Sequence, residues 1–129
     1  MIYKGAIKTS ACKLFPRLTR LFDTFSPTRE CWSCDVKYVI MKKGHIWPRC
    51  ARSNLLLTSH LALSVPSDVS ISVLNETRTW TKGDVLIFDG SFEHEIWNNG
   101  TGVLMLLSFH MRHHKLFKGD RWKANLWPH

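Results

Sequence analysis

Apolar runs and alternating apolar and polar residues dominate the chain from residue 35 onward, and these patterns predict β-strands. The segment DVKYVIM at 35–41 is rich in β-branched and aromatic residues. NLLLTSHLALSV at 54–65 is a longer apolar run, which a Pro-Ser-Asp turn closes. Residues 69–73 read Val-Ser-Ile-Ser-Val, the two-residue period of a strand with one buried face.

Three further segments continue the pattern toward the C-terminus. DVLIFD at 84–89 and FEHEIWN at 92–98 are separated by Asp-Gly, which predicts a tight hairpin turn at residues 89–90. After Asn-Gly at 99–100, the apolar run GVLMLLSFHM at 102–111 predicts a buried strand. Six or seven short strands at near-regular spacing are typical of a β-sandwich or jelly roll.

The N-terminal part of the chain follows a helical period instead. Leucine and phenylalanine recur at helical spacing within residues 8–25, but Pro16 confines a helix to the residues from it onward. Ser26-Pro27 then ends it. The predicted fold class is therefore mainly β, a jelly roll with one short N-terminal helix.

Length and composition indicate a single globular domain over residues 1–129. The chain is 44% hydrophobic and 22% charged, which excludes the disordered class. No run of about 18 apolar residues and no signal-peptide pattern occurs, so the chain as written is expected to be soluble and not secreted. The net charge of +8 comes from scattered Lys and Arg that are locally dense only at 112–123. Without a finger, RNP or helix-turn-helix pattern, this charge predicts a solvated basic surface and no nucleic-acid partner.

The four cysteines are too few for a disulfide framework in a chain of this length. Cys31 and Cys34 have CxxC spacing, but a second CxxC is absent and the motif follows a Ser-Pro turn rather than a strand. Structural thiols, or one disulfide in an oxidising compartment, are expected.

Histidines are the candidate chemical groups. Alternation within 92–98 places His94 on the same face as Phe92 and Ile96, whereas Glu93, Glu95 and Trp97 take the other. An inward histidine between apolar neighbours is either a satisfied core group or a ligand or catalyst, and the residues alone leave both open.

Three segments carry a family resemblance: KGHIWPRCARSN, SHLALSVP and NETRTWTKGDVLIFDGSFEHEIWNN. They resemble the catalytic domain of the aspartyl/asparaginyl β-hydroxylases, within the Fe(II)/2-oxoglutarate oxygenase superfamily. The resemblance covers about residues 4–116 and leaves a basic tail at 117–129. It implies a double-stranded β-helix that binds Fe(II) and 2-oxoglutarate and hydroxylates Asp or Asn in EGF-like domains. It also implies a family anchored in the endoplasmic reticulum membrane, whose partner is an EGF-like or other acidic polypeptide.

The resemblance also assigns site residues. It implies His94 as the family's second iron ligand, His60 as a contact to the proximal carboxylate of 2-oxoglutarate, and His45 as a possible further metal ligand. Arg49 falls on the position of the first iron ligand. A guanidinium has no lone pair to offer a metal. It would also repel a divalent ion about 4 Å away by on the order of 8 kcal/mol at an effective dielectric near 20.

The co-substrate positions depart from the family pattern in the same way. The residues that stand where the family has arginine, serine, arginine, glycine and aspartate are Leu104, Val39, Thr58, Ala62 and Gly90, respectively. A bidentate arginine is what fixes a planar carboxylate, and leucine cannot replace it. In contrast, Trp47, Trp80, Phe88 and Phe92 match the family and are expected to build the fold.

Three interpretations follow. The chain is a peptide-aspartate β-dioxygenase with a rebuilt site, in which His94 and His60 hold iron together with His45 or Cys50, although alternation would point Cys50 away from Arg49. Alternatively it is a catalytically inactive pseudoenzyme that binds an acidic polypeptide through its basic surface. Third, it is a truncated or decayed copy of a longer hydroxylase, which poor folding would reveal.

Overall fold

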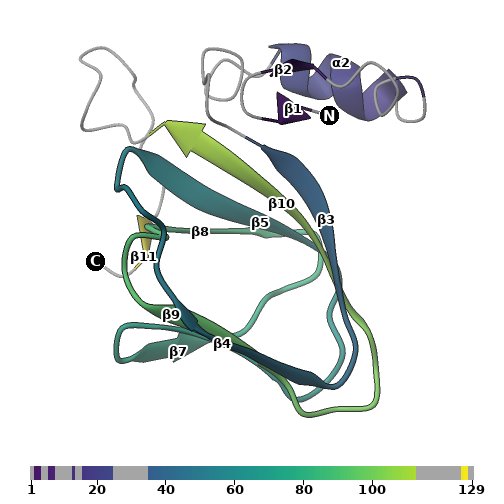
Figure 1. The fold of residues 1–129 in the computed structure, drawn as a ribbon. Helices are drawn as coiled ribbons and strands as arrows, with labels where there is room; N and C mark the ends of the chain where they lie inside the picture. The colour runs from purple at the N-terminus through teal and green to yellow at the C-terminus, as the bar shows by residue number, and fades with distance from the viewer. Residues whose placement is uncertain are drawn as a thin grey trace.

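The computed structural model describes residues 2–3, 6–7, 13, 16–24, 35–112 and 126–127, and its main body consists of two β-sheets that face each other (Figure 1). The five-stranded sheet has the order β11-β8-β5-β10-β3, and the four-stranded sheet has the order β4-β9-β6-β7. Their strands are β3 (Val36–Met41), β4 (Gly44–Arg49), β5 (Leu56–Ser64), β6 (Val69–Val73), β7 (Glu76–Arg78), β8 (Val85–Phe88), β9 (His94–Asn98), β10 (Leu104–Arg112) and β11 (Leu126–Trp127). The predicted mainly β jelly-roll class is confirmed.

Every strand predicted from the hydrophobic pattern is present, with ends shifted by up to two residues. Two strands of the four-stranded sheet, β4 and β7, escaped prediction. β4 contains Pro48, which is tolerated because β4 lies at the edge of its sheet. The hairpin from β6 to β7 turns at Leu74, whose φ of 54° is uncommon for leucine, so the sequence carries no glycine signal there.

The predicted hairpin at Asp89-Gly90 is wrong, although a turn does form at these residues. Asp89 accepts hydrogen bonds from the Ser91 amide at its side chain (2.9 Å) and from the Phe92 amide at its backbone carbonyl (3.3 Å). The strands on either side pair in different sheets, β8 with β5 and β9 with β4 and β6. The turn therefore carries the chain from one sheet to the other, because a jelly roll is closed by such crossings rather than by local hairpins alone.

The N-terminal part contains helix α2 (Pro16–Thr24) and a two-stranded ribbon of β1 (Ile2–Tyr3) and β2 (Ala6–Ile7). The helix begins at Pro16 and ends before Ser26-Pro27, as predicted. None of the described helices is long and apolar enough to cross a membrane. Within the basic tail, β11 pairs in parallel with β8. The CxxC motif and the rest of the tail lie outside the described residues.

The core lies between the two sheets. It contains the predicted Trp80 and Phe88, together with Ile71 and Val73 of β6 and Leu104 of β10. A second apolar cluster, which includes Leu107 and Phe109, lies on the opposite face of the five-stranded sheet. Alternation along β10 accounts for both clusters, since even-numbered residues face the partner sheet and odd-numbered ones face away.

Asn98 joins the ends of the two sheets. Its buried side-chain amide donates to the carbonyl oxygens of Met41 (3.0 Å) and Gly102 (2.9 Å), and its side-chain oxygen accepts from the Gly100 amide (3.2 Å). These bonds fix the turn between β9 and β10. They thereby help to place β10, which carries several residues of the cavity described next.

Candidate functional site

A cavity of about 180 Å³ lies between the two sheets. The five-stranded sheet lines it with polar residues, whose side chains share its inner face by cross-strand pairing: Lys37, Thr58, His60, Ser108 and His110. The four-stranded sheet contributes Arg49, His94 and Ile96, and the connecting segments contribute Cys50, Ala51 and Gly90. The cavity thus begins where the apolar core ends along the same strands.

Arg49 lies directly opposite His94. The register of β4 against β9 pairs these two residues, after an irregularity that separates them from the pair of Ile46 with Ile96. Both line the cavity. The position implied as that of the first metal ligand is therefore adjacent to His94 in space, and a permanently charged guanidinium occupies it.

The His94 ring is oriented by its own backbone. Its Nδ1 lies 2.9 Å from the carbonyl oxygen of Phe92 and donates to it, which leaves Nε2 as the nitrogen with a lone pair. Burial lowers the pKa of His94, and the Arg49 charge lowers it further, whereas the bond to Phe92 opposes both. His94 keeps the geometry of a ligand histidine, but its neighbour disfavours any cation beside it.

His60 is buried in the floor of the cavity, with only 6% of its surface exposed. Its ring meets Phe88 edge-on at 5.2 Å between centroids, and the opposite wall places His94 at the same distance from Phe88. Nδ1 of His60 is buried without a hydrogen-bond partner in the structure. Burial lowers the pKa of His60 to about 3, and the charges of His94, Lys37, His110 and Arg49 act in the same direction.

This low pKa makes His60 a source of acid sensitivity. The unfolded chain has the usual pKa of 6.5, so between pH 6.5 and about 3 the unfolded state binds a proton that the folded state does not. We expect the free energy of unfolding to fall by up to about 1.4 kcal/mol per pH unit in this range from His60 alone. Urea unfolding of the wild type and His60→Gln at pH 7 to 4 measures this, and equal pH slopes for the two proteins would contradict it.

Lys37, Ser108 and His110 were not singled out by sequence reasoning. Nδ1 of His110 lies 2.5 Å from Oδ1 of Asp35, and Nζ of Lys37 lies 3.6 Å from Oδ2 of the same carboxylate. The hydrogen bond from His110 is the main cause that lowers the pKa of Asp35. The only available signal was the polar residues that interrupt the otherwise apolar strand at 102–111.

The position implied for the distal carboxylate of 2-oxoglutarate lies in the hydrophobic core. Leu104, at the expected arginine, is 0% exposed, and Val39, at the expected serine, packs against the same cluster. Leu106 pairs with Val39 across the strands. A carboxylate placed here would be desolvated without a partner, which is costly.

Thr58 and Gly90, which both depart from the family pattern, are in contact. A Cβ added at Gly90 would lie 2.8 Å from Oγ1 of Thr58, too close for any side chain to fit without displacement. The places where the family has an arginine and an aspartate are thus filled by two small residues packed together. This close approach leaves no room for a larger side chain at residue 90 unless Thr58 moves.

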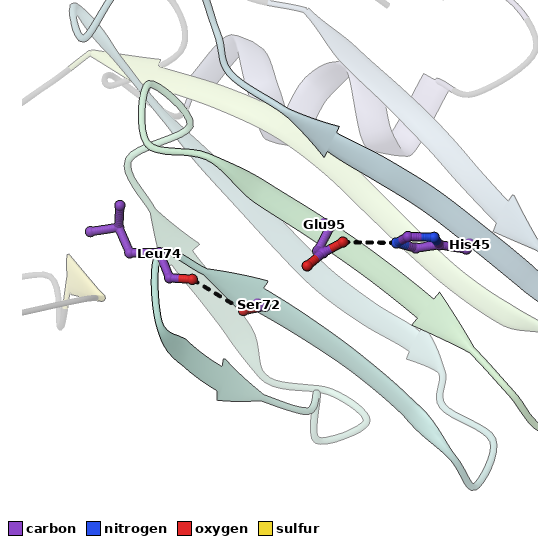
Figure 2. Close-up of polar contacts among 4 residues, drawn as sticks. All are labelled: His45, Ser72, Leu74 and Glu95. Atoms are coloured by element: carbon purple, nitrogen blue, oxygen red, sulfur yellow. Dashed lines mark hydrogen bonds and ion pairs between the residues drawn. The ribbon is translucent and has the colours of Figure 1, made fainter.

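The structure does not bring His45 to the cavity. It lies on the outer face of the four-stranded sheet, where Nε2 is 2.9 Å from Oε2 of Glu95 (Figure 2). Its ring also stacks on Trp97, with 5.0 Å between the centroids. Trp47, expected to build the fold, is 76% exposed beside it. Cys50, expected to point away from Arg49, lines the same cavity because strand alternation ends with β4.

Comparison with known proteins places this geometry in a family. The sequence profile of the aspartyl/asparaginyl β-hydroxylases matches residues 1–114. The chain belongs to this family. It is 39% identical to the aspartyl/asparaginyl β-hydroxylase of Mus musculus and 37% identical to that of Homo sapiens, in each case over 120 residues and 92% of the chain. It spans only 16% of the length of either relative.

Solved structures show the fold of this β-hydroxylase family member independently. A cupin domain of a transcriptional regulator from Enterobacter cloacae superposes with a TM-score of 0.53 at 14% sequence identity, over 62% of this chain and 82% of that one. At this identity the likeness concerns the fold alone. It agrees with the two facing antiparallel sheets described above.

The residues present do not fit the iron and co-substrate that a hydroxylase of this family implies. Among the described residues, no three His, Cys, Asp or Glu side chains are grouped so that they could hold a metal ion. Three described histidines, His60, His94 and His110, line the cavity, but they are not grouped as a metal site and Arg49 lies opposite His94. His60 lines the cavity, and Thr58 stands beside it at the position for which the resemblance implies an arginine.

Proposed function

We propose that this β-hydroxylase family member binds an acidic polypeptide at the cavity between its sheets and does not hydroxylate it through Fe(II) and 2-oxoglutarate. The observation that carries the proposal is the register that sets Arg49 opposite His94. A fixed positive charge at this point attracts a carboxylate and repels a metal ion. EGF-like domains, which the family resemblance names, are the first class of partner to test.

The apolar filling of the co-substrate position supports the same conclusion. Leu104 belongs to the buried core, and the half-buried Val39 packs against it and presents an apolar side chain to the cavity, so a carboxylate here would be buried without a partner. Arg49 and Lys37 instead present positive charge to a ligand that enters from outside, and both side chains are exposed. Such charges contribute to association mainly through electrostatic attraction, which salt screens.

A rebuilt oxygenase is the second candidate. It is favoured by His60 and His94 lining one cavity, with the second nitrogen of His94 oriented by the Phe92 carbonyl as in metal-bound histidines. Its site would lack the carboxylate clamp that the family places at residues 58 and 104. The two candidates differ in whether a metal ion and 2-oxoglutarate stabilise the folded chain.

Thermal and urea unfolding with Mn(II) and 2-oxoglutarate, singly and together, decides between them. Mn(II) serves as a redox-inert substitute for Fe(II), and Mg(II) at equal ionic strength is the control. A ligand at a hundred times its dissociation constant adds about 2.7 kcal/mol to the free energy of unfolding. We expect no added stability from the pair. Joint stabilisation by Mn(II) and 2-oxoglutarate would establish the rebuilt oxygenase and refute the proposal.

The polypeptide half of the proposal has its own test. Isothermal titration calorimetry measures the affinity for an Asp-rich peptide and for the same peptide with Asn at every Asp position. The two peptides have equal length and differ in charge. We expect only the acidic peptide to bind, with an affinity that falls as the salt concentration rises. Arg49→Gln should lower this affinity at least tenfold. Arg52→Gln is the matched control, since Arg52 is exposed three residues away and does not line the cavity. Equal affinity for both peptides would refute acidic recognition.

A further inference from the structure

Hydrogen-bond donors surround the cavity from both sheets. Lys37 on β3 and Arg49 on β4 are basic and lie on opposite walls. Thr58 and Ser108, which carry hydroxyls, line the same cavity from the five-stranded sheet. None of the described residues that line the cavity is acidic. This lining is complementary to an anion that has more acceptor atoms than one carboxylate.

Asp35 is the acidic side chain in contact with this lining, and it is already engaged. Its carboxylate pairs with His110 at 2.5 Å and with Lys37 at 3.6 Å. The longer pair is weak, because the Lys37 side chain is 52% exposed and solvent screens the attraction. The Lys37 ammonium has three donors, so it can accept a second anionic partner in the cavity.

The buried floor of the cavity contains an unmet donor or acceptor. His60 is more than nine-tenths buried, lines the cavity, and has no hydrogen-bond partner at Nδ1. Burial lowers the pKa of His60, and the charges of His94, Lys37, His110 and Arg49 act in the same direction, so the ring is neutral at pH 7. Buried polar atoms are normally paired, and one left without a partner indicates a missing ligand or water. Because His60 lines the cavity, a ligand oxygen bound there can supply this partner.

We propose that the cavity is a binding site for a phosphate monoester, held between Arg49 on one sheet and Lys37 on the other. A phosphate monoester carries about −1.5 to −2 charges and three acceptor oxygens at neutral pH, against one charge and two oxygens for a carboxylate. It therefore matches two fixed cations and a surplus of donors, and the guanidinium fork binds it bidentately. The volume of 180 Å³ equals that of about six water molecules, which admits the group with part of its carrier.

This inference deepens the proposed function and rests on its claim that the cavity does not hold iron. The phosphate can belong to a phosphoserine or phosphothreonine side chain of the acidic polypeptide or to a small phosphorylated molecule. Isothermal titration of the full chain separates these sources with four probes: a short peptide with one phosphoserine, the same peptide with Ser or Glu at that position, and inorganic phosphate. Phosphorus NMR of the phosphopeptide reports directly on the phosphoryl group.

We expect the phosphopeptide to bind at least tenfold more tightly than the Glu peptide. Arg49→Gln and Lys37→Gln should each lower the affinity for the phosphopeptide at least tenfold. Arg52→Gln and Lys42→Gln are the matched controls, since both residues are exposed and neither lines the cavity. If inorganic phosphate binds as tightly as the phosphopeptide, and both variants lower its affinity equally, the site is supported. Its ligand is then a small phosphate rather than a phosphorylated side chain.

Equal affinity for the Glu and phosphoserine peptides overturns the inference but leaves acidic polypeptide recognition intact. Phosphate binding that both variants leave unchanged overturns it too, as does the absence of phosphate binding. Stabilisation by Mn(II) and 2-oxoglutarate in the unfolding assay would instead show that the proposed function itself fails. If Arg49→Gln does not fold, Lys37→Gln gives the same test, because the exposed Lys37 side chain is not part of the core.

Discussion

Phe88→Ala should lower the free energy of unfolding by about 3–5 kcal/mol. Phe88 is 0% exposed and belongs to the core between the sheets. Its ring also contacts both His60 and His94, with 5.2 Å between its centroid and each imidazole. Removing the ring leaves a cavity beside two polar side chains, which a core of fixed strands cannot close. Urea unfolding monitored by tryptophan fluorescence measures the loss.

The matched control is Val85→Ala, on the same strand but 48% exposed, for which we expect a loss well under that of Phe88→Ala. Phe88→Leu should recover most of the stability, since it restores apolar volume. A loss below about 1 kcal/mol for Phe88→Ala would show that the two sheets are not packed through this residue. The placement of both histidines against one ring would then be wrong as well.

Arg49→His should raise the affinity for divalent metal ions above that of the wild type. The substitution removes a fixed positive charge from the position opposite His94 and supplies an imidazole nitrogen in its place. Stabilisation by Mn(II) or Ni(II) should then rise by about 1.4 kcal/mol for each tenfold increase in metal above the dissociation constant. Addition of 2-oxoglutarate should contribute nothing further, because the apolar side chains of Leu104 and Val39 remain where the resemblance implies its distal carboxylate.

Arg52→His provides the control for this experiment, since it places a histidine on the same segment but outside the cavity lining. Equal metal affinity of Arg49→His and Arg52→His would mean that residue 49 does not face His94. Stabilisation by 2-oxoglutarate in Arg49→His would mean that the co-substrate site survives, and only the metal site has been lost. The experiment thus separates the two departures from the family pattern that the sequence shows side by side.

The sequence predicted the strands that bury one face and failed for those that do not. Val69, Ile71 and Val73 alternate with serines, and β6 forms where this period predicts it. β4 has no such period, because it is an edge strand with no fully buried residue and it contains a proline. The turn at Asp89 was recognised, but its direction was not, because the same local bonds can join strands within a sheet or between sheets.

For the site, the sequence by itself determined the inward face of His94, the burial of Trp80 and Phe88, and the charge of Arg49, since each depends on residue type and strand period. Only the tertiary structure decided which groups share the cavity. Lys37, Ser108 and His110 join it because β3 pairs with β10 across most of the chain, and His45 leaves it because β4 turns that side chain outward. The contact of Thr58 with Gly90 likewise depends on a crossing between sheets. Such long-range pairings are set by packing of whole sheets, which no local pattern encodes.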